Sequence, residues 1–375
     1  MIGGVDLMKA LVAIDSYKGS ATSQELNAAV CQKLTEMGIA SCNVPIADGG
    51  EGTMAILAAA FAGKEIAVPT IDLLGQPITG KYWLTEIAGV KTAIIESAQI
   101  LGLTQITPSE KTIQKAHSYG LGLVILAALK KAKQVYVSLG GSGVNDGGLG
   151  MLAALNQQDI PSKNPLLLGK DFLQAVRLPN FTAKKIIGLT DVSNFYTGAH
   201  GFTYIFGPQK GGTPAILAQL EAGAKCVQKK FQDKIDVNAF SGSGAAGGIG
   251  GGLLLAGGML QPGFPTIAQM LKLEEKMADC KFVITGEGRF DEQTAQGKVP
   301  LGMARLARRH NLAVVAFCGA RPDHTVGIEY HFDGVFAIQT KPLSLQNAMV
   351  KETTLHNIGL LTENVMKVYL AGKNS

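Results

Sequence analysis

The chain contains 375 residues, with 34 Lys and Arg against 29 Asp and Glu, which gives a formal net charge of +5. At roughly 150 residues per domain, this length predicts two domains with separate hydrophobic cores. Hydrophobic residues make up 46% of the chain and no long run of like charge occurs, which excludes disordered, collagen-like and coiled-coil proteins. The positive charge is weak and diffuse, so we expect no nucleic-acid partner.

Cysteine usage and the N-terminal segment indicate the compartment. The five cysteines form no CxxC pair, so neither a disulfide framework nor a zinc site is predicted. The apolar run that ends at Asp15 is too short and wrongly flanked for a signal peptide. The longest uncharged apolar stretch, Gly244 to Leu260, is interrupted by many glycines, which argues against a membrane span. We expect a cytoplasmic protein without membrane association.

The first third of the chain has the order strand, loop, helix, repeated twice. We expect strands at 10–14 and 40–45 and helices at 23–37 and 54–61, which is typical of a parallel sheet. From 64 to 98, short alternating runs are separated by glycine turns. This pattern predicts antiparallel strands.

The remainder of the chain alternates again between helices and buried strands. The predicted helices are 113–130, 149–155 and 300–310, and the predicted strands are 134–139, 185–189, 281–284, 313–317 and 335–338. Parallel units at both ends with mixed strands between them predict a two-domain α/β protein. A doubly wound, Rossmann- or flavodoxin-like domain of residues 1–63 and 279–375 is interrupted by an inserted mixed α/β domain of residues 64–278.

Polar, glycine-rich loops follow most of the expected strands, and ligands of open α/β sheets bind beyond the carboxyl ends of strands. Asp15, Ser16 and Lys18 offer a carboxylate, a hydroxyl and a cation at one such end. Alternatively, Asp15 caps the next helix and Lys18 is solvated. Asp48 and Glu51 precede a helix, where paired carboxylates could hold Mg²⁺, and simple helix capping is the alternative.

Three further loops carry candidate groups. Asn145 and Asp146 lie between glycine pairs and either orient a ligand or form an ordinary turn. Asp191 ends an apolar strand, where partial desolvation suits a general base, with capping as the alternative. Lys210 lies in a tight loop that could bind an anion, and a solvated turn lysine is the other interpretation.

Two glycine-rich segments point toward phosphate chemistry. The G-x-G-x-x-G pattern at 242–247 follows a poor strand and has no acidic residue about twenty positions later, which argues against a Rossmann cofactor site. Its glycines instead allow backbone amides to approach an anion. The segment 285–291, followed by Lys298, combines amides, two carboxylates and a lysine, a grouping that phosphoryl transfer requires. No P-loop and no G-x-S-x-G motif occurs.

Six ordered blocks resemble the bacterial glycerate kinase family over nearly the whole chain. They are Asp15–Ser20, Ala47–Thr53, Gly140–Gly148, Phe206–Gly211, Gly244–Gly248 and Ile284–Gly288 with Gly297-Lys298. The resemblance implies an ATP- and Mg²⁺-dependent kinase that phosphorylates D-glycerate, usually to 2-phosphoglycerate, with its site in an interdomain cleft. It also implies that Asp191 accepts the hydroxyl proton, that Lys18 and Lys298 bind phosphate, and that Ser243 contacts the substrate or the transferred phosphate.

The complete set of expected site residues follows from the motifs and the resemblance together. Asp191, Lys298 and Lys18 are expected to be catalytic. Substrate contacts are expected from Asp15, Ser16, Asn145, Asp146, Asn194 and Ser243. Nucleotide or phosphate contacts are expected from Lys210, Gly244, Gly286, Glu287, Gly288 and Asp291. Asp48 and Glu51 are the expected metal ligands, and the protein is expected to be a monomer or homodimer.

The chain departs from the family pattern at two places. The family usually has Asp-Val-x-Asn-Pro-Leu after the aspartate, whereas this chain has Phe195-Tyr196 in place of Pro-Leu. Gly143-Val144 replaces a common Ala-Thr, which removes one hydroxyl. The alternatives are therefore a kinase for another small hydroxy acid and a non-catalytic regulator that binds nucleotide or glycerate. A phosphatase or mutase would need a phosphoenzyme nucleophile or a dimetal cluster, and the motifs contain neither.

Overall fold

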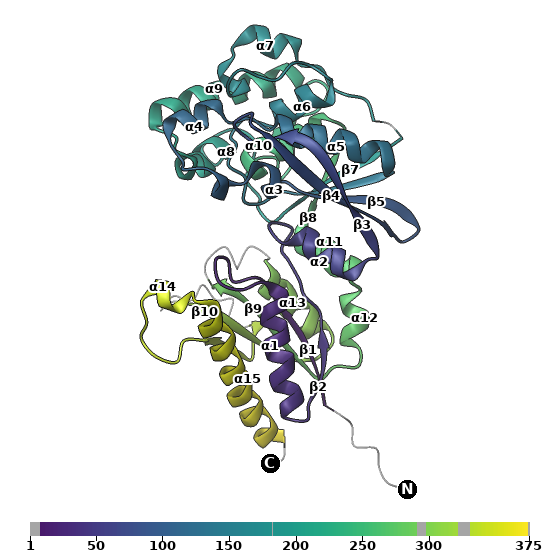
Figure 1. The fold of residues 1–375 in the computed structure, drawn as a ribbon, viewed down its shortest axis with the longest axis vertical. Helices are drawn as coiled ribbons and strands as arrows, with labels where there is room; N and C mark the ends of the chain where they lie inside the picture. Colours follow the sequence, from purple (N-terminus) through teal and green to yellow (C-terminus); the bar gives the residue numbers. More distant parts are fainter. Residues whose placement is uncertain (1–7, 182, 291–297, 322–330, 374–375) are drawn as a thin grey trace. The chain divides into compact units, whose positions relative to one another are not determined.

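The computed structural model describes residues 8–181, 183–290, 298–321 and 331–373, and the chain divides into two compact units (Figure 1). Unit 1 comprises Met1–Asp48 and Phe264–Ser375, and unit 2 comprises Gly49–Gly263. Each unit has its own hydrophobic core. The chain is thus an α/β protein, as its alternating pattern predicts.

Unit 1 is built on a five-stranded sheet in the order β11-β10-β9-β1-β2, in which every neighbouring pair is parallel. The strands are β1 Lys9–Ile14, β2 Ala40–Asn43, β9 Phe282–Arg289, β10 Ala313–Ala320 and β11 Gly334–Ala337. In chain order this is the flavodoxin-like arrangement, whose strand order reverses between β1 and β9. In such sheets ligands bind beyond the carboxyl ends of the strands at this reversal.

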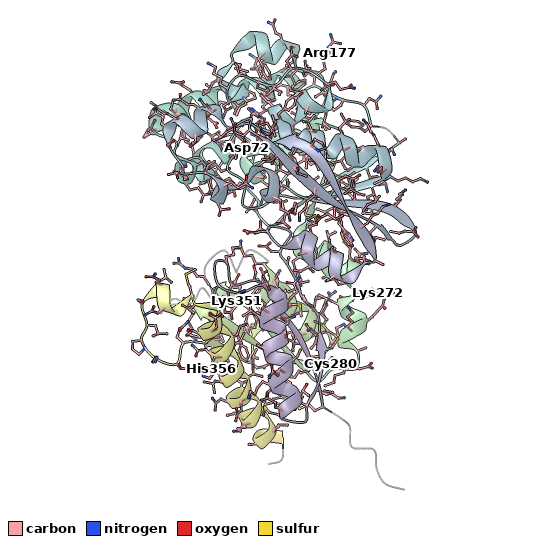
Figure 2. All side chains as sticks on the ribbon, in the orientation of Figure 1. Asp72, Arg177, Lys272, Cys280, Lys351 and His356 are labelled. Carbon is pink, nitrogen blue, oxygen red and sulfur yellow. The ribbon has the colours of Figure 1, made fainter. Side chains whose placement is uncertain are left out.

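The helices of unit 1 include two that lie side by side, α1 and α15 (Figure 1). The helices are α1 Ser23–Glu36, α12 Leu273–Met277, α13 Val299–Arg309, α14 Leu345–Ala348 and α15 Lys351–Lys373, with α11 Gly263–Met270 at the boundary. A capping box of Thr22 and Glu25 begins α1. Lys351 lies at the start of α15 (Figure 2). It donates a hydrogen bond to Glu25 of α1 at 2.7 Å and so ties α15 to α1.

Unit 2 is built on a six-stranded mixed sheet in the order β3-β4-β5-β6-β7-β8. The strands are β3 Gly63–Ile71, β4 Pro77–Ile87, β5 Val90–Glu96, β6 Gln134–Ser138, β7 Lys185–Thr190 and β8 Met259–Pro262. The first three strands are antiparallel, which confirms the interpretation of the alternating runs, and β5 to β8 are parallel. Loops after β6 and β7 therefore meet at one edge.

Helices of very different length complete unit 2. They are α2 Thr53–Ala60, α3 Ala98–Leu101, α4 Glu110–Lys115, α5 Tyr119–Lys131, α6 Leu149–Leu155, α7 Lys170–Ala175, α8 Phe202–Phe206, α9 Pro214–Phe231 and α10 Ala245–Leu255. The start of α10 is not regular, because Ala246, Gly247 and Gly248 have left-handed backbone angles. Within the described ranges of both units, no helix is both long and apolar enough to cross a bilayer.

One element prediction is wrong. The single helix expected at 113–130 is two helices, α4 and α5, separated at 116–118. The break arises because both the amide and the hydroxyl of Ser118 donate to the carboxylate of Asp146, at 2.7 and 2.8 Å. The chain also forms two long helices that were not predicted, α9 and α15.

The division by contacts differs from the predicted domain boundaries at both ends of the insertion. Residues 49–63, predicted to belong with the N-terminal segment, lie in unit 2. Glu96, at the end of β5, accepts hydrogen bonds from the amides of Gly52 and Met54 and thereby holds the start of α2. Residues 264–278, predicted to belong to the insertion, lie in unit 1, where Phe264 packs directly against Gly302 of α13.

We expect Gly120→Ala in α5 to destabilise the protein by roughly 1–3 kcal/mol through overpacking. A Cβ at this position would lie 1.9 Å from the carbonyl oxygen of Ile71 in β3. Gly359→Ala in α15 is the matched control, because a Cβ there meets only Lys33 Cε at 4.0 Å. The control should gain about 0.5–1 kcal/mol from helix propensity. Chemical denaturation measures the free energy of unfolding of both variants. Equal changes in the two variants would contradict the packing argument.

Candidate functional site

A cavity of about 490 Å³ lies in unit 1, where the strand order reverses. Its walls come from the loop after β1, the end of β9, the loop after β10 and the segment from β11 to the start of α15. Every lining residue belongs to unit 1. The volume falls in the range typical of sites for small molecules and cofactors.

Three buried carboxylates form one side of this cavity: Asp15, Asp48 and Glu287. The backbone amide of Asp15 donates to Gly286 O at 2.9 Å, which fixes the loop after β1 against β9. Burial raises the pKa of Asp15 well above its ordinary value, and the negative charges of Asp48 and Glu287 raise it further. The Ser16 amide, which donates to the Asp15 carboxylate at 2.7 Å, opposes this shift, as does the charge of Lys18.

Four cationic side chains line the same cavity: Lys18, Arg289, Lys298 and Arg321. Lys298 directly precedes α13, and Pro300 lies in the first turn of that helix. Because proline has no N–H group, one fewer backbone donor in this turn needs a hydrogen-bond partner. The structure thus brings the predicted Asp15, Ser16, Lys18, Asp48, Glu287, Gly288 and Lys298 together around one cavity. Cations beside carboxylates suit a polyanionic ligand that carries a divalent metal ion.

The lining of the cavity also includes apolar residues that the sequence analysis missed. They are Ile338, Leu345, Ala348 and Met349. Arg321, also missed, follows the expected strand at 313–317, so the rule that ligands bind at strand ends would have found it. The apolar residues follow no motif, and only the fold brings them beside the loop after β1.

In unit 2, four predicted loops pack together at the carboxyl ends of β6 and β7. The Gly147 amide donates to Gly247 O at 3.0 Å, and the Gly244 amide donates to Asn194 O at 2.9 Å. Lys210 Nζ donates to the carbonyl oxygen of Val144. The loops that carry Asn145, Asp146, Asp191, Asn194, Lys210, Ser243 and Gly244 are therefore neighbours. Asp191 itself is half-buried and directly follows β7.

Asp146 has a fully buried carboxylate whose acceptor capacity is taken up by the chain. It accepts hydrogen bonds from the amide and hydroxyl of Ser118 and from the amides of Gly148 and Gly150, at 2.7–3.1 Å. A carboxylate offers about four lone-pair positions. These contacts place Asp146 as the support of the glycine loop and leave little capacity for a substrate.

Asn145 and Ser243 are also fully buried, but their polar atoms are without partners. Neither the amide oxygen nor the amide nitrogen of Asn145 has a hydrogen-bond partner, and the same holds for the Ser243 hydroxyl. An unsatisfied buried polar group costs about 1–3 kcal/mol. Each side chain therefore has polar atoms that the chain itself does not satisfy, and their expected contact with substrate stays a prediction.

Lys210 is buried rather than a solvated turn residue. Burial lowers its pKa from 10.5 to about 7, and the nearby negative charge of Asp146 opposes this shift. Because its ammonium donates to Val144 O, the lysine holds the loop after β6 against the 208–210 turn. Its observed contact is with the chain's own backbone.

Gly244 and Gly286 act through the backbone, whereas Asn194 makes a side-chain hydrogen bond within its own loop. A Cβ on Gly244 would lie 2.3 Å from Phe195 O, and a Cβ on Gly286 would lie 2.1 Å from Phe317 O, so both positions require glycine. The side-chain amide of Asn194 donates to His200 O at 3.1 Å and closes the loop after β7. This loop is held without the family's proline.

The two expected metal ligands lie in different units. Asp48 lines the cavity of unit 1, whereas Glu51 is exposed in unit 2, with its carboxylate near Gly141. In the part of the chain that the structure describes, no group of three or more His, Cys, Asp or Glu is arranged to hold a metal ion. Asp291, expected to contact the nucleotide, lies outside the described residues.

We expect Asp15→Asn to raise the melting temperature at neutral pH by a few degrees, on the order expected for 1–2 kcal/mol. The folded-state pKa of Asp15 is raised, so the wild-type protein loses stability as the pH rises above 3.8 toward the raised value. The stability advantage of the variant should therefore grow as the pH rises from about 4 toward neutral and disappear below about pH 4. Calorimetry across this range measures it, and an advantage that grows on acidification would contradict the assignment.

We expect the stability difference between Lys210→Met and the wild type to change with pH. Between the folded pKa of about 7 and the ordinary value of 10.5, the unfolded chain binds a proton that the folded chain has lost. Wild-type stability should therefore rise with pH in this window, whereas the variant lacks this contribution. Chemical denaturation at pH values across the window tests this, and a constant difference would refute the lowered pKa.

Comparisons with known proteins show the family to which this chain belongs. The model of the glycerate kinase family matches residues 10–370. A glycerate kinase of Haemophilus influenzae is 36% identical over 353 residues, which cover 88% of this chain and 91% of that protein. A glycerate 2-kinase of Escherichia coli is 33% identical over 358 residues, which cover 91% of this chain and 93% of that protein.

A solved structure shares the fold as well. The crystal structure of a Salmonella typhimurium protein assigned as glycerate kinase 2 superimposes with a TM-score of 0.80 at 31% identity. The superposition covers 98% of this chain and all of that one. With the family match spanning nearly its whole length, this chain belongs to the glycerate kinase family.

Proposed function

We propose that this kinase transfers a phosphoryl group from ATP to D-glycerate and yields 2-phosphoglycerate. The observation that carries the proposal is the cavity of unit 1, in which four cationic side chains face three buried carboxylates at the reversal of strand order. The family assignment supports the kinase reaction, and the glycerate 2-kinase named among its relatives supports the 2-hydroxyl as acceptor.

The cations of the cavity would bind the phosphates. In phosphoryl transfer the negative charge spreads over the oxygens of the transferred group, and catalysis consists largely of positioning and electrostatic stabilisation. Lys18, Lys298 and the two arginines come from three different segments of one cavity, so they can contact several phosphate oxygens at once. The removal of either lysine would then weaken stabilisation of the transition state.

The carboxylates of the cavity fit a magnesium ion that accompanies ATP. Mg²⁺ is usually held by one or two carboxylates together with substrate phosphates, so the protein needs no complete cage of its own. Asp15 and Asp48 would hold it, because both are buried carboxylates that line this cavity. When bound, Mg²⁺ neutralises charge on the phosphate oxygens.

The acceptor side of the reaction would fall to residues of unit 2. Asp191 takes the proton from the glycerate hydroxyl as its oxygen bonds to the γ-phosphorus and ADP departs with the electron pair of the broken bond. Its half-buried position after β7 supports this role. The unpartnered Asn145 and Ser243 side chains would hydrogen-bond glycerate.

We expect turnover of Mg·ATP with D-glycerate, and a loss of about 10² or more in kcat for Asp191→Asn. The assay measures ADP release with D-glycerate, L-glycerate, glycerol and lactate, and phosphorus NMR identifies the product. Asp159→Asn is the matched control, because Asp159 is an exposed carboxylate in a different loop of unit 2.

Each outcome decides between the alternatives. Turnover of another hydroxy acid in place of D-glycerate would identify a kinase with a different substrate. Binding of ATP or glycerate without turnover on any acceptor would indicate the regulator. A 3-phosphoglycerate product would contradict the choice of hydroxyl, and full activity of Asp191→Asn would refute Asp191 as the base.

A further inference from the structure

The three side chains proposed to act on the acceptor come from three separate segments of unit 2. Asp191 directly follows β7, Asn145 lies in the loop after β6, and Ser243 lies shortly before α10. A reaction that uses all three needs their segments at fixed separations, because a misplacement of about 1 Å can lower a rate about 10²-fold. The contacts that fix these separations therefore bear on the rate.

Tyr196 is a side chain that contacts all three segments. It is fully buried and belongs to the same loop as Asp191. Its hydroxyl donates a hydrogen bond to the carbonyl oxygen of Gly147, two residues beyond Asn145, at 2.8 Å. Its ring lies against α10, because a Cβ added to Gly251 would lie 2.3 Å from the Cδ2 atom of the ring. One side chain thus joins the three segments.

The backbone groups that receive Tyr196 are themselves held in place. The Gly147 amide donates to Gly247 O at 3.0 Å, so this glycine is bonded through both its N–H and its carbonyl group. The Gly251 amide donates to Ser243 O at 2.6 Å. Gly147 also has a φ of +67°, and a Cβ there would lie 2.3 Å from the Tyr196 hydroxyl oxygen. The tyrosine therefore has no room to shift toward the glycine loop.

The loop that carries Tyr196 is anchored on the side away from Asp191. The Gly198 amide donates to Glu221 Oε1 of α9 at 2.8 Å. The ring of Tyr196 also packs edge to face on Phe202 of α8, with the ring centroids 5.0 Å apart. Because the ring is fixed by these neighbours, its hydroxyl bond defines the distance between the loop after β7 and the loop after β6.

The Tyr196 hydroxyl acts as a permanent donor. Burial raises the pKa of Tyr196 well above its ordinary value, and the nearby negative charge of Asp146 raises it further. The hydroxyl therefore stays protonated under any ordinary assay condition, and its proton is directed at the Gly147 carbonyl oxygen. This arrangement suits a residue that holds others in place rather than one that transfers a proton.

We propose that Tyr196 is a positioning residue for phosphoryl transfer, because its hydrogen bond to Gly147 sets the separation between the loop of Asp191 and the loop of Asn145. This inference rests on the proposed function for the roles of Asp191 and Asn145. It adds a residue that acts only through the positions of others.

The test removes the hydroxyl and keeps the ring. Tyr196→Phe should lower kcat with D-glycerate about tenfold, since the base is no longer held at its place. KM for ATP should stay within about twofold, because the proposed nucleotide cavity belongs to unit 1 and Tyr196 to unit 2. Tyr119→Phe is the matched control, because the Tyr119 hydroxyl donates to another backbone carbonyl of unit 2, Gln158 O, at 2.7 Å.

The control separates positioning from stability. Both variants lose one hydrogen bond to a backbone carbonyl, so their denaturation midpoints should fall by similar amounts, but kcat of Tyr119→Phe should stay within about twofold of the wild type. Tyr196→Phe is also made in the Asp191→Asn background. There it should change kcat less than about twofold, because the base that it positions is already absent.

The outcomes distinguish this inference from the proposed function. Wild-type kcat in Tyr196→Phe, an equal loss of kcat in Tyr119→Phe, or an equal loss in both backgrounds would overturn the role of Tyr196 and leave the kinase reaction standing. If the wild type phosphorylates another hydroxy acid, D-glycerate is the wrong substrate, and the same kcat ratios measured with that acid decide the role of Tyr196. Full activity of Asp191→Asn would refute both the base and its positioning.

Discussion

The burial of Asp15 beside two other carboxylates is the constraint around which unit 1 is arranged. Three buried carboxylates in one cavity oppose folding, and the raised pKa of Asp15 records that opposition. Sheet topology forces them together, because β1 and β9 are neighbours and their carboxyl ends meet. The charge of Lys18 offsets part of the repulsion, and a cationic ligand would offset more. The buried carboxylates thus lower the stability of the unliganded protein at a place where a bound cation would raise it again.

Unit 2 shows a similar compromise among the buried polar groups Asn145, Asp146 and Lys210. Asp146 satisfies its acceptors with the chain's own donors and fixes the loop, whereas the neighbouring Asn145 has none satisfied. Lys210 gives up much of its charge on burial while holding Val144. Rigid support and unsatisfied polar groups therefore occur side by side, which is the arrangement expected where a small ligand supplies the missing partners.

Patterns in the sequence predicted those structural features that depend on residues close together in the chain. The strands, the capping box of α1 and the glycine loops follow from hydrophobic periodicity and turn chemistry, and motifs at strand ends located Asp15, Lys18 and Lys298. Long-range contacts were beyond reach: the break before α5 depends on Asp146, twenty-eight residues from Ser118. The apolar lining at Leu345 and Met349 has no periodic signature, because α14 has only four residues.

The discontinuity of unit 1 also governs the order in which the chain can fold. β1 is a central strand whose neighbours are β2 and β9. In the sequence, Gly49–Gly263 separate the two segments that form unit 1, so β1 and β9 lie on different sides of the insertion. Synthesis proceeds from the N-terminus, so β1 must wait with one open edge until β9 has been made. Unit 2 is complete earlier and can fold first. Its folding holds residues 49 and 263 in one compact body, which shortens the loop that must be closed when β9 joins β1.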